Sequence, residues 1–128
     1  MTKMNEDFLQ FIWENKLFRT ANNYTTDNEP VEIINVGLKN RDSGPDFFNA
    51  KIKIGDKLWA GNVEIHINSS DWEKHNHQNN KAYNSVILQV VKFFDKEISR
   101  ENGEKIPTLI IDFKQDIFDS YQKMLSEK

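Results

Sequence analysis

The sequence contains no cysteine and no long apolar segment. Without cysteine the chain cannot form a disulfide framework, a thiolate metal site or a thiol nucleophile. No segment reaches the roughly 20 apolar residues that a membrane-crossing helix needs. The N-terminus also lacks the pattern of a secretory signal peptide. We therefore expect a cytoplasmic protein that does not associate with membranes.

The sequence also has no excess of positive charge. The formal net charge is −3 at pH 7, whereas a strong nucleic-acid binder usually presents a basic face. Between residues 35 and 81, however, basic residues slightly outnumber acidic ones. The length of 128 residues fits one domain, residues 1–128, with a core of its own.

The segment from Ser43 to Ile67 predicts two strands joined by a tight turn at Gly55-Asp56. Glycine in the first central position suits a hairpin turn whose twist matches that of the strands. Side chains alternate between the faces of a strand. The first strand is therefore expected to carry one row that consists of Asp46, Phe48, Ala50, Ile52 and Ile54.

On the second strand the same alternation places Asn62, Glu64 and His66 on one face. Asp46 and Glu64 are about equally far from the turn, so we expect them at the same end of neighbouring strands. Two such carboxylates repel each other unless a cation or a proton lies between them. The sequence therefore predicts a site suited to magnesium-dependent phosphodiester chemistry. The alternative is that Asp46 caps a turn and Glu64 pairs with a nearby lysine.

The other elements follow from periodicity and turn chemistry. A helix over Met4–Phe18 has Asn5 as its cap, and Ser70 with Glu73 matches a capping box for a short second helix. The remaining expected elements are a strand at Val31–Val36, a buried strand at Val86–Phe94, a hairpin that turns at Asn102-Gly103, and a terminal helix from Gln115 to Ser126.

Pro45-Asp46, the hairpin and Glu64-Ile65-His66 together resemble the PD-(D/E)xK signature of the restriction-endonuclease-like nuclease superfamily. Gly-Pro-Asp-Phe-Phe-Asn-Ala from Gly44 and Trp-Ala-Gly-Asn-Val-Glu-Ile-His from Trp59 also resemble an uncharacterised bacterial domain-of-unknown-function family. Chains of that family are longer, so we expect this domain to be the N-terminal part of a larger protein.

The nuclease resemblance implies an α/β (α+β) fold with a mixed sheet. Its order is helix, three strands, helix and strand, here followed by a C-terminal hairpin and helix. It also implies that Asp46 and Glu64 bind Mg²⁺ or Mn²⁺ and that His66, in the position usual for lysine, orients or deprotonates water. The substrate would be DNA or RNA. Candidate supporting residues are Glu14 on the first helix, Asn62, Gln89, Asp71 and His75.

Two alternatives remain open. His66, His75 and His77 lie close to Asp71 in the sequence, and imidazole with carboxylate suits zinc, iron or manganese. The nuclease-like fold could instead serve as an inactive binding or assembly module, which the missing lysine and the acidic overall charge favour.

Overall fold

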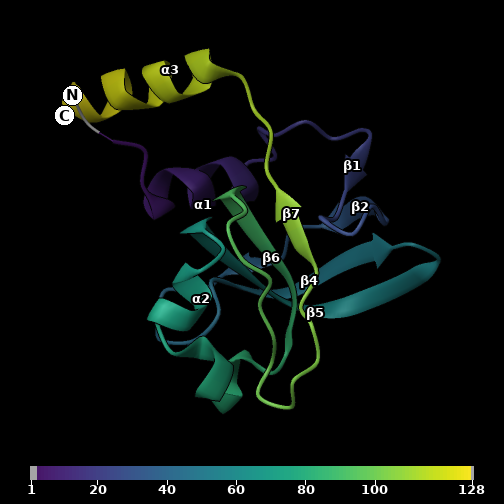
Figure 1. Cartoon of the computed structure of the whole chain (residues 1–128). Helices are drawn as coiled ribbons and strands as arrows, with labels where there is room; N and C mark the ends of the chain where they lie inside the picture. The colour runs from purple at the N-terminus through teal and green to yellow at the C-terminus, as the bar shows by residue number, and fades with distance from the viewer. Residues whose placement is uncertain (1–2, 128) are drawn as a thin grey trace.

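The computed structural model describes residues 3–127 and has a mixed α+β fold (Figure 1). Its elements are, in order, α1 (Glu6–Glu14), β1 (Asn23–Tyr24), β2 (Pro30–Asn35), β3 (Leu38–Lys39), β4 (Phe47–Ile54), β5 (Lys57–Asn68), α2 (Asp71–Lys74), the 3₁₀ turns η1 (His77–Asn79) and η2 (Lys81–Tyr83), β6 (Val86–Phe93), β7 (Thr108–Ile110) and α3 (Gln115–Ser126). None of the helices within residues 3–127 has the length and apolar content that a bilayer crossing requires.

One mixed sheet organises the molecule. Its strand order is β1-β2-β4-β5-β6-β7, and β3 pairs with β4. The pairs β2–β4 and β4–β5 are antiparallel, whereas β5–β6 and β6–β7 are parallel. A bridge between Thr25 and Leu109, supported by a 2.9 Å hydrogen bond from Thr26 N to Thr108 O, links the two edges of the sheet. The sheet is therefore strongly curled.

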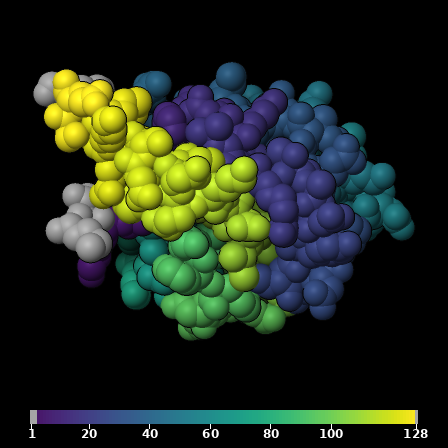
Figure 2. All heavy atoms as spheres, turned by 90° about the horizontal axis from the view of Figure 1, so that it is seen from above, coloured from purple at the N-terminus to yellow at the C-terminus, as the bar shows by residue number. Residues whose placement is uncertain are grey.

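Helix α1 packs on one face of the sheet, and α3 lies on the outer side of α1 (Figure 1). The predicted cap of α1 is confirmed, because Asn5 Oδ1 accepts a 3.0 Å bond from Phe8 N. Phe8 contacts Phe118 and Tyr121 of α3, with ring centroids 4.9 and 5.1 Å apart. In the space-filling view α3, in yellow, lies across the molecule beside the N-terminal segment (Figure 2). The fully buried side chains of this core include Leu9, Ile12, Trp13, Phe47, Ile52, Val63, Ile65 and Leu88.

The other face packs against α2, η1 and η2. A smaller apolar cluster here consists of Trp72, Tyr83, Val86, Ile98 and Ile106. Trp72 is fully buried in this cluster, with 0 % exposure. The capping box was wrong: Ser70 makes no side-chain cap, and its hydroxyl donates to Asp95 Oδ2 at 2.6 Å instead.

The C-terminal hairpin expected from the sequence is reduced to a turn. Residues 100–104 do turn, with a bond from Arg100 N to Glu104 O, but only the bridge Ser99–Lys105 follows. The chain then continues into β7, which pairs parallel with β6 rather than antiparallel with the preceding segment. Pairing with a strand already in the sheet satisfies more backbone groups than an isolated hairpin would. The terminal helix was predicted with the observed bounds.

Candidate functional site: a buried carboxylate and histidine cluster

Asp46 and Glu64 meet where β4 begins beside the middle of β5. Glu64 Oε1 accepts a bond from Asp46 N at 3.1 Å, and Asp46 Oδ2 accepts one from Ile65 N at 2.8 Å. Each carboxylate thus binds the other strand's backbone. The structure brings together the two acids that the sequence singled out.

A bulge in β4 produces this meeting. Ala50 pairs with Gly61, but Phe47 pairs with Val63, so β4 contains one extra residue between these pairs. Asn49 adopts φ 60 there, a conformation that asparagine tolerates better than most residues. Without the bulge, the pairing seen near the turn would place Asp46 opposite Ile65; with it, Asp46 lies opposite Glu64.

The bulge also corrects the predicted row of side chains. Phe47 is buried with Ala50, Ile52 and Ile54, whereas Phe48 is only half-buried. Asp46 therefore does not share a face with these core residues as a regular strand would require. Asn62 supports the bulge, since its Oδ1 accepts from Asn49 N at 3.2 Å and its Nδ2 donates to Ser85 Oγ at 2.8 Å.

Two histidines converge on Glu64. His66 Nε2 and His77 Nε2 lie 3.0 and 2.9 Å from the same oxygen, Glu64 Oε2. His66 comes from β5, and His77 is brought back over the sheet because Asn76 adopts φ 60 after α2. The rings of His66 and His77 are stacked with centroids 5.3 Å apart. All three side chains are buried, with exposures of 4 % or less for Glu64 and His66 and 7 % for His77.

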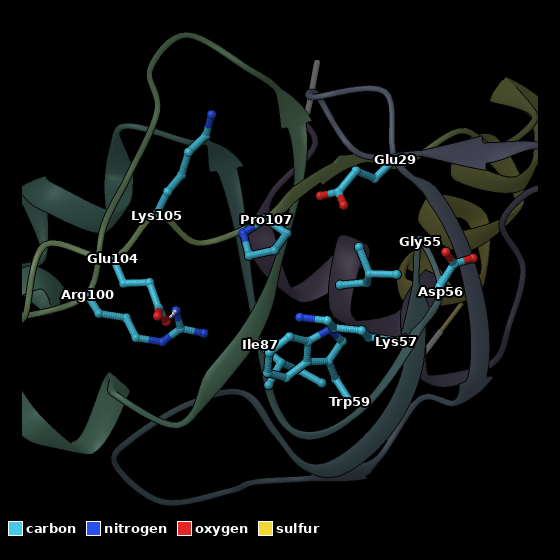
Figure 3. A pocket seen from close by; sticks show the side chains of 11 residues that line it. Glu29, Gly55, Asp56, Lys57, Trp59, Ile87, Arg100, Glu104, Lys105 and Pro107 are labelled. Atoms are coloured by element: carbon cyan, nitrogen blue, oxygen red, sulfur yellow. Dashed lines mark hydrogen bonds and ion pairs between the residues drawn. The ribbon is translucent and has the colours of Figure 1, made fainter.

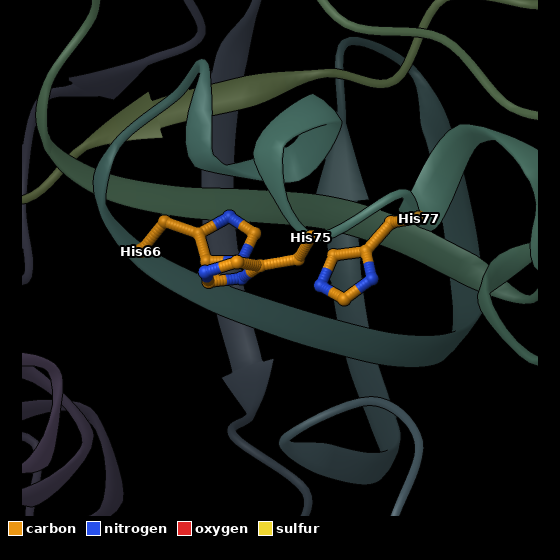
Figure 4. A group of neighbouring side chains, drawn as sticks. All are labelled: His66, His75 and His77. Atoms are coloured by element: carbon orange, nitrogen blue, oxygen red, sulfur yellow. The ribbon is translucent and has the colours of Figure 1, made fainter.

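His75 completes a group of three imidazoles (Figure 4). One ligand nitrogen of each of His66, His75 and His77 lies within 4.8 Å of the others. His75 is exposed, whereas the other two are buried. The cluster therefore has one side open to solvent.

The short contacts to Glu64 are not ordinary hydrogen bonds. Among the described residues, His66 Nε2 and both ring nitrogens of His77 are buried without a hydrogen-bond partner of acceptable geometry. Buried polar groups normally have such partners. These ring nitrogens are free to take another partner, and His66, His75 and His77 together could hold a metal ion.

Burial and neighbouring charges shift the pKa values of Asp46 and Glu64 in opposite directions. Burial, followed by the charge of Glu64, raises the pKa of Asp46. Burial alone would raise the pKa of Glu64 too, but its contacts with His66 and His77 outweigh burial and lower that pKa. The environment thus shifts the pKa of Asp46 upward and that of Glu64 downward.

A polar chain lies behind His66. Gln89 Nε2 is 2.8 Å from His66 Nδ1 and 3.1 Å from Ser69 O, and Thr108 Oγ1 donates to Gln89 Oε1 at 3.3 Å. Gln89, which the sequence analysis expects to support the site, thus contacts both His66 and the backbone of Ser69. On the other side, Tyr83 stacks on His77 with centroids 3.7 Å apart.

The chain matches a known family along nearly its whole length. The family model described as a protein of unknown function (DUF2851) covers residues 6–128. The chain belongs to the DUF2851 family. Comparison with curated proteins gave no match, and comparison with solved structures gave none either.

Of two further acids predicted to support the site, Glu14 lies elsewhere, exposed at the C-terminal end of α1. Asp71 begins α2, where its Oδ2 accepts from Asn68 N at 3.1 Å. Glu6 is the acid of α1 whose pKa is influenced by the cluster. Burial raises the pKa of Glu6, and His66 and Glu64 also act on it. Sequence reasoning missed Glu6 because its position in the first helical turn already had an explanation in the helix dipole.

Several hollows of the surface are lined by residues outside the cluster. A cavity of about 490 Å³ lies between the β4–β5 turn and the loop that carries Arg100 and Lys105 (Figure 3). Two of its three cations are paired, Lys105 with Asp27 and Glu97 and Arg100 with Glu104, whereas Lys57 has no ion pair among the described residues. One unpaired cation falls short of the basic lining expected for a phosphate track. Another hollow, of about 420 Å³, is lined by Met4, Asn5, Glu6, Asp7 and Ile67.

Proposed function

We propose that this domain is a metal-dependent hydrolase whose ion is held by Glu64, His66 and His77, with His75 at the open side. One observation carries the proposal: two buried ring nitrogens lie 3.0 and 2.9 Å from one carboxylate oxygen without hydrogen-bond geometry. For metal–ligand distances of about 2.0–2.2 Å, neighbouring ligand atoms lie about 2.8–3.1 Å apart in octahedral geometry and about 3.3–3.6 Å apart in tetrahedral geometry, so the observed separations match neighbouring octahedral ligands. The donor atoms present fit a metal ion.

The donor set favours a transition metal over the oxygen-bound Mg²⁺ expected from the sequence. Imidazole nitrogens suit zinc, iron or manganese, whereas Mg²⁺ prefers oxygen ligands and retained water. Asp46 and Glu64 alone would leave the two buried imidazoles unexplained. The experiment described below therefore compares different divalent ions.

The chemistry assigned to the residues is as follows. A bound divalent ion supplies Lewis acidity and a water of lowered pKa. Glu64 remains anionic and holds the imidazoles in place, while Asp46 holds a proton next to Glu64 and can exchange it with a reacting group. The open side at His75 is where a substrate would reach these groups.

Phosphodiesters are the proposed substrates. One line of support is the resemblance to the nuclease motif. The other is the arrangement of the strands around the motif: β4 pairs antiparallel with both β2 and β5, and β6, which follows α2, pairs parallel with β5. The two acids lie at the start of β4 and on β5, where a restriction-endonuclease-like site would have them. DNA and RNA remain the proposed polymeric substrates.

The test begins with metal-free protein and one divalent ion at a time. We expect Zn²⁺ or Mn²⁺ to support hydrolysis of bis(p-nitrophenyl) phosphate and of single- or double-stranded nucleic acid, and Glu64→Gln to abolish it. Glu14→Gln, at an exposed acid of α1, is the matched control and should keep the activity. Metal binding without any hydrolysis would contradict the proposed reaction.

A structural metal site is the second candidate, because Glu64 and His66 are almost fully buried and closed sites are typical of structural zinc. A tightly bound ion that raises the unfolding temperature without supporting turnover would favour this reading.

A further inference from the structure

The contacts of Gln89 with residues other than His66 fix the orientation of its side-chain amide. It is fully buried on β6, and the amide group 3.1 Å from Ser69 O faces an atom that can only accept. That group must therefore be the NH₂ of Gln89, because the reversed amide would place two acceptors against each other. Thr108 Oγ1, which donates to Gln89 Oε1 at 3.3 Å, fits the same orientation.

The same NH₂ lies 2.8 Å from His66 Nδ1. A donor at this distance requires an acceptor, so Nδ1 carries the lone pair and the proton of the neutral ring resides on Nε2. Nε2 is the nitrogen that faces Glu64 Oε2 at 3.0 Å. With this amide orientation His66 presents an N–H, rather than a lone pair, to the cluster.

A metal ion needs the opposite tautomer. Ligation through Nε2 requires its lone pair and leaves the proton on Nδ1, which in metal sites usually donates to a carboxylate or carbonyl oxygen. Gln89 would meet that need only by turning its amide over, so that Oε1 faces Nδ1. It would then lose its bond to Ser69.

We propose that Gln89 is a positioning residue that holds His66 in the metal-excluding tautomer and couples metal binding at Nε2 to reversal of its own amide. The inference rests on the proposed metal site for its consequence, but the tautomer itself is a property of the metal-free chain. The exchange conserves protons: one leaves Nε2 to solvent and one is taken up at Nδ1. Gln89 thereby weakens metal capture by His66.

Long-range ¹H–¹⁵N correlation spectra of metal-free protein test the tautomer directly. We expect the pattern of a protonated Nε2 and an unprotonated Nδ1 for His66 in the wild type. Protonation of Nδ1 would overturn the proposal. This result does not depend on metal binding: a protein with the expected tautomer that binds no metal would refute the proposed function and leave the role of Gln89 standing.

Two substitutions then test the coupling, with Zn²⁺ or Co²⁺ alone as the probe. Gln89→Glu provides an acceptor for Nδ1–H and should tighten metal binding by about 10-fold or more, the size typical of changes behind a metal-ligating histidine. Gln89→Met, which has neither donor nor amide oxygen, should fall between it and the wild type. Gln115→Glu, at an exposed glutamine of α3, is the control and should change nothing. Weaker binding in both Gln89 variants would show a merely structural role and contradict the proposal.

Discussion

The two faces of the sheet are both buried, but by different kinds of side chain. On β5, Val63 and Ile65 join the apolar core, while the alternating residues Glu64 and His66 are buried on the opposite side. Apolar burial stabilises by about 25 cal/mol per Å². A buried carboxylate costs free energy unless it is well paired. The apolar core thus favours the folded state, whereas the buried carboxylate on the other side needs compensation, which the proposed ion would provide.

The largest effect is expected from the apolar face. Phe8→Ala removes a fully buried ring that contacts Phe118 and Tyr121. Loss of such a ring should lower the free energy of unfolding by about 3–5 kcal/mol, as measured by urea denaturation. Leu58→Ala, at a side chain that is 64 % exposed, should change it by less than about 0.5 kcal/mol. Equal effects would mean that the helical layer is not a tight core.

The polar face should instead respond to metal. At a free metal concentration of 100 times Kd, the wild type should gain about 2.7 kcal/mol of stability, and Glu64→Gln should lose this gain. Thermal melts with and without Zn²⁺ measure the difference. Phe8→Ala, although unstable, should keep its metal-induced shift. A Glu64→Gln protein that is still stabilised by metal would sever the link between the carboxylate and the ion.

The β4 bulge affects both faces of the sheet, because it sets the pairing of Asp46 with Glu64 and the burial of Phe47. Substitution of Gly37 tests the importance of this bulge. A Cβ at Gly37 would lie 2.6 Å from Phe48 O, whereas a Cβ at Gly103 would meet nothing within 4 Å. Both glycines have positive φ, 90 and 86, so alanine brings similar backbone strain. Gly37→Ala should therefore destabilise by about 1–3 kcal/mol more than Gly103→Ala, as overpacking does. It should also weaken metal binding in calorimetric titration. Identical losses would show that Gly37 does not support the bulge.

The smallest effect concerns acid stability. Hydrogen bonds from Ser70 and Ser69 lower the pKa of Asp95 to about 2. Because the folded-state pKa lies below the unfolded value of about 3.9, this group contributes stability above pH 4 and loses it as the pH falls toward 2. Asp95→Asn should flatten that part of the stability profile, as measured by denaturation at several pH values. An unchanged slope between pH 4 and 2 would contradict this role.

Much of this architecture follows from the sequence, because the strong signals are local. The Gly55-Asp56 turn, the apolar run of β6 and the periodicity of α3 gave their elements with small errors in the bounds. The convergence of Asp46 and Glu64 was expected, but for an incomplete reason, since regular alternation cannot reveal the bulge at Asn49. His77 reaches the site because Asn76 has a left-handed backbone conformation, and Glu6 reaches it because α1 packs against the sheet. Neither cause leaves a periodic pattern in the sequence.

The most direct test of the central claim is an anomalous difference map from crystals of the protein loaded with zinc, recorded at the zinc edge. We expect one buried peak at about 2.0–2.2 Å from Glu64 Oε2, His66 Nε2 and His77 Nε2. No peak at this position, or zinc bound only at exposed His75, would contradict it.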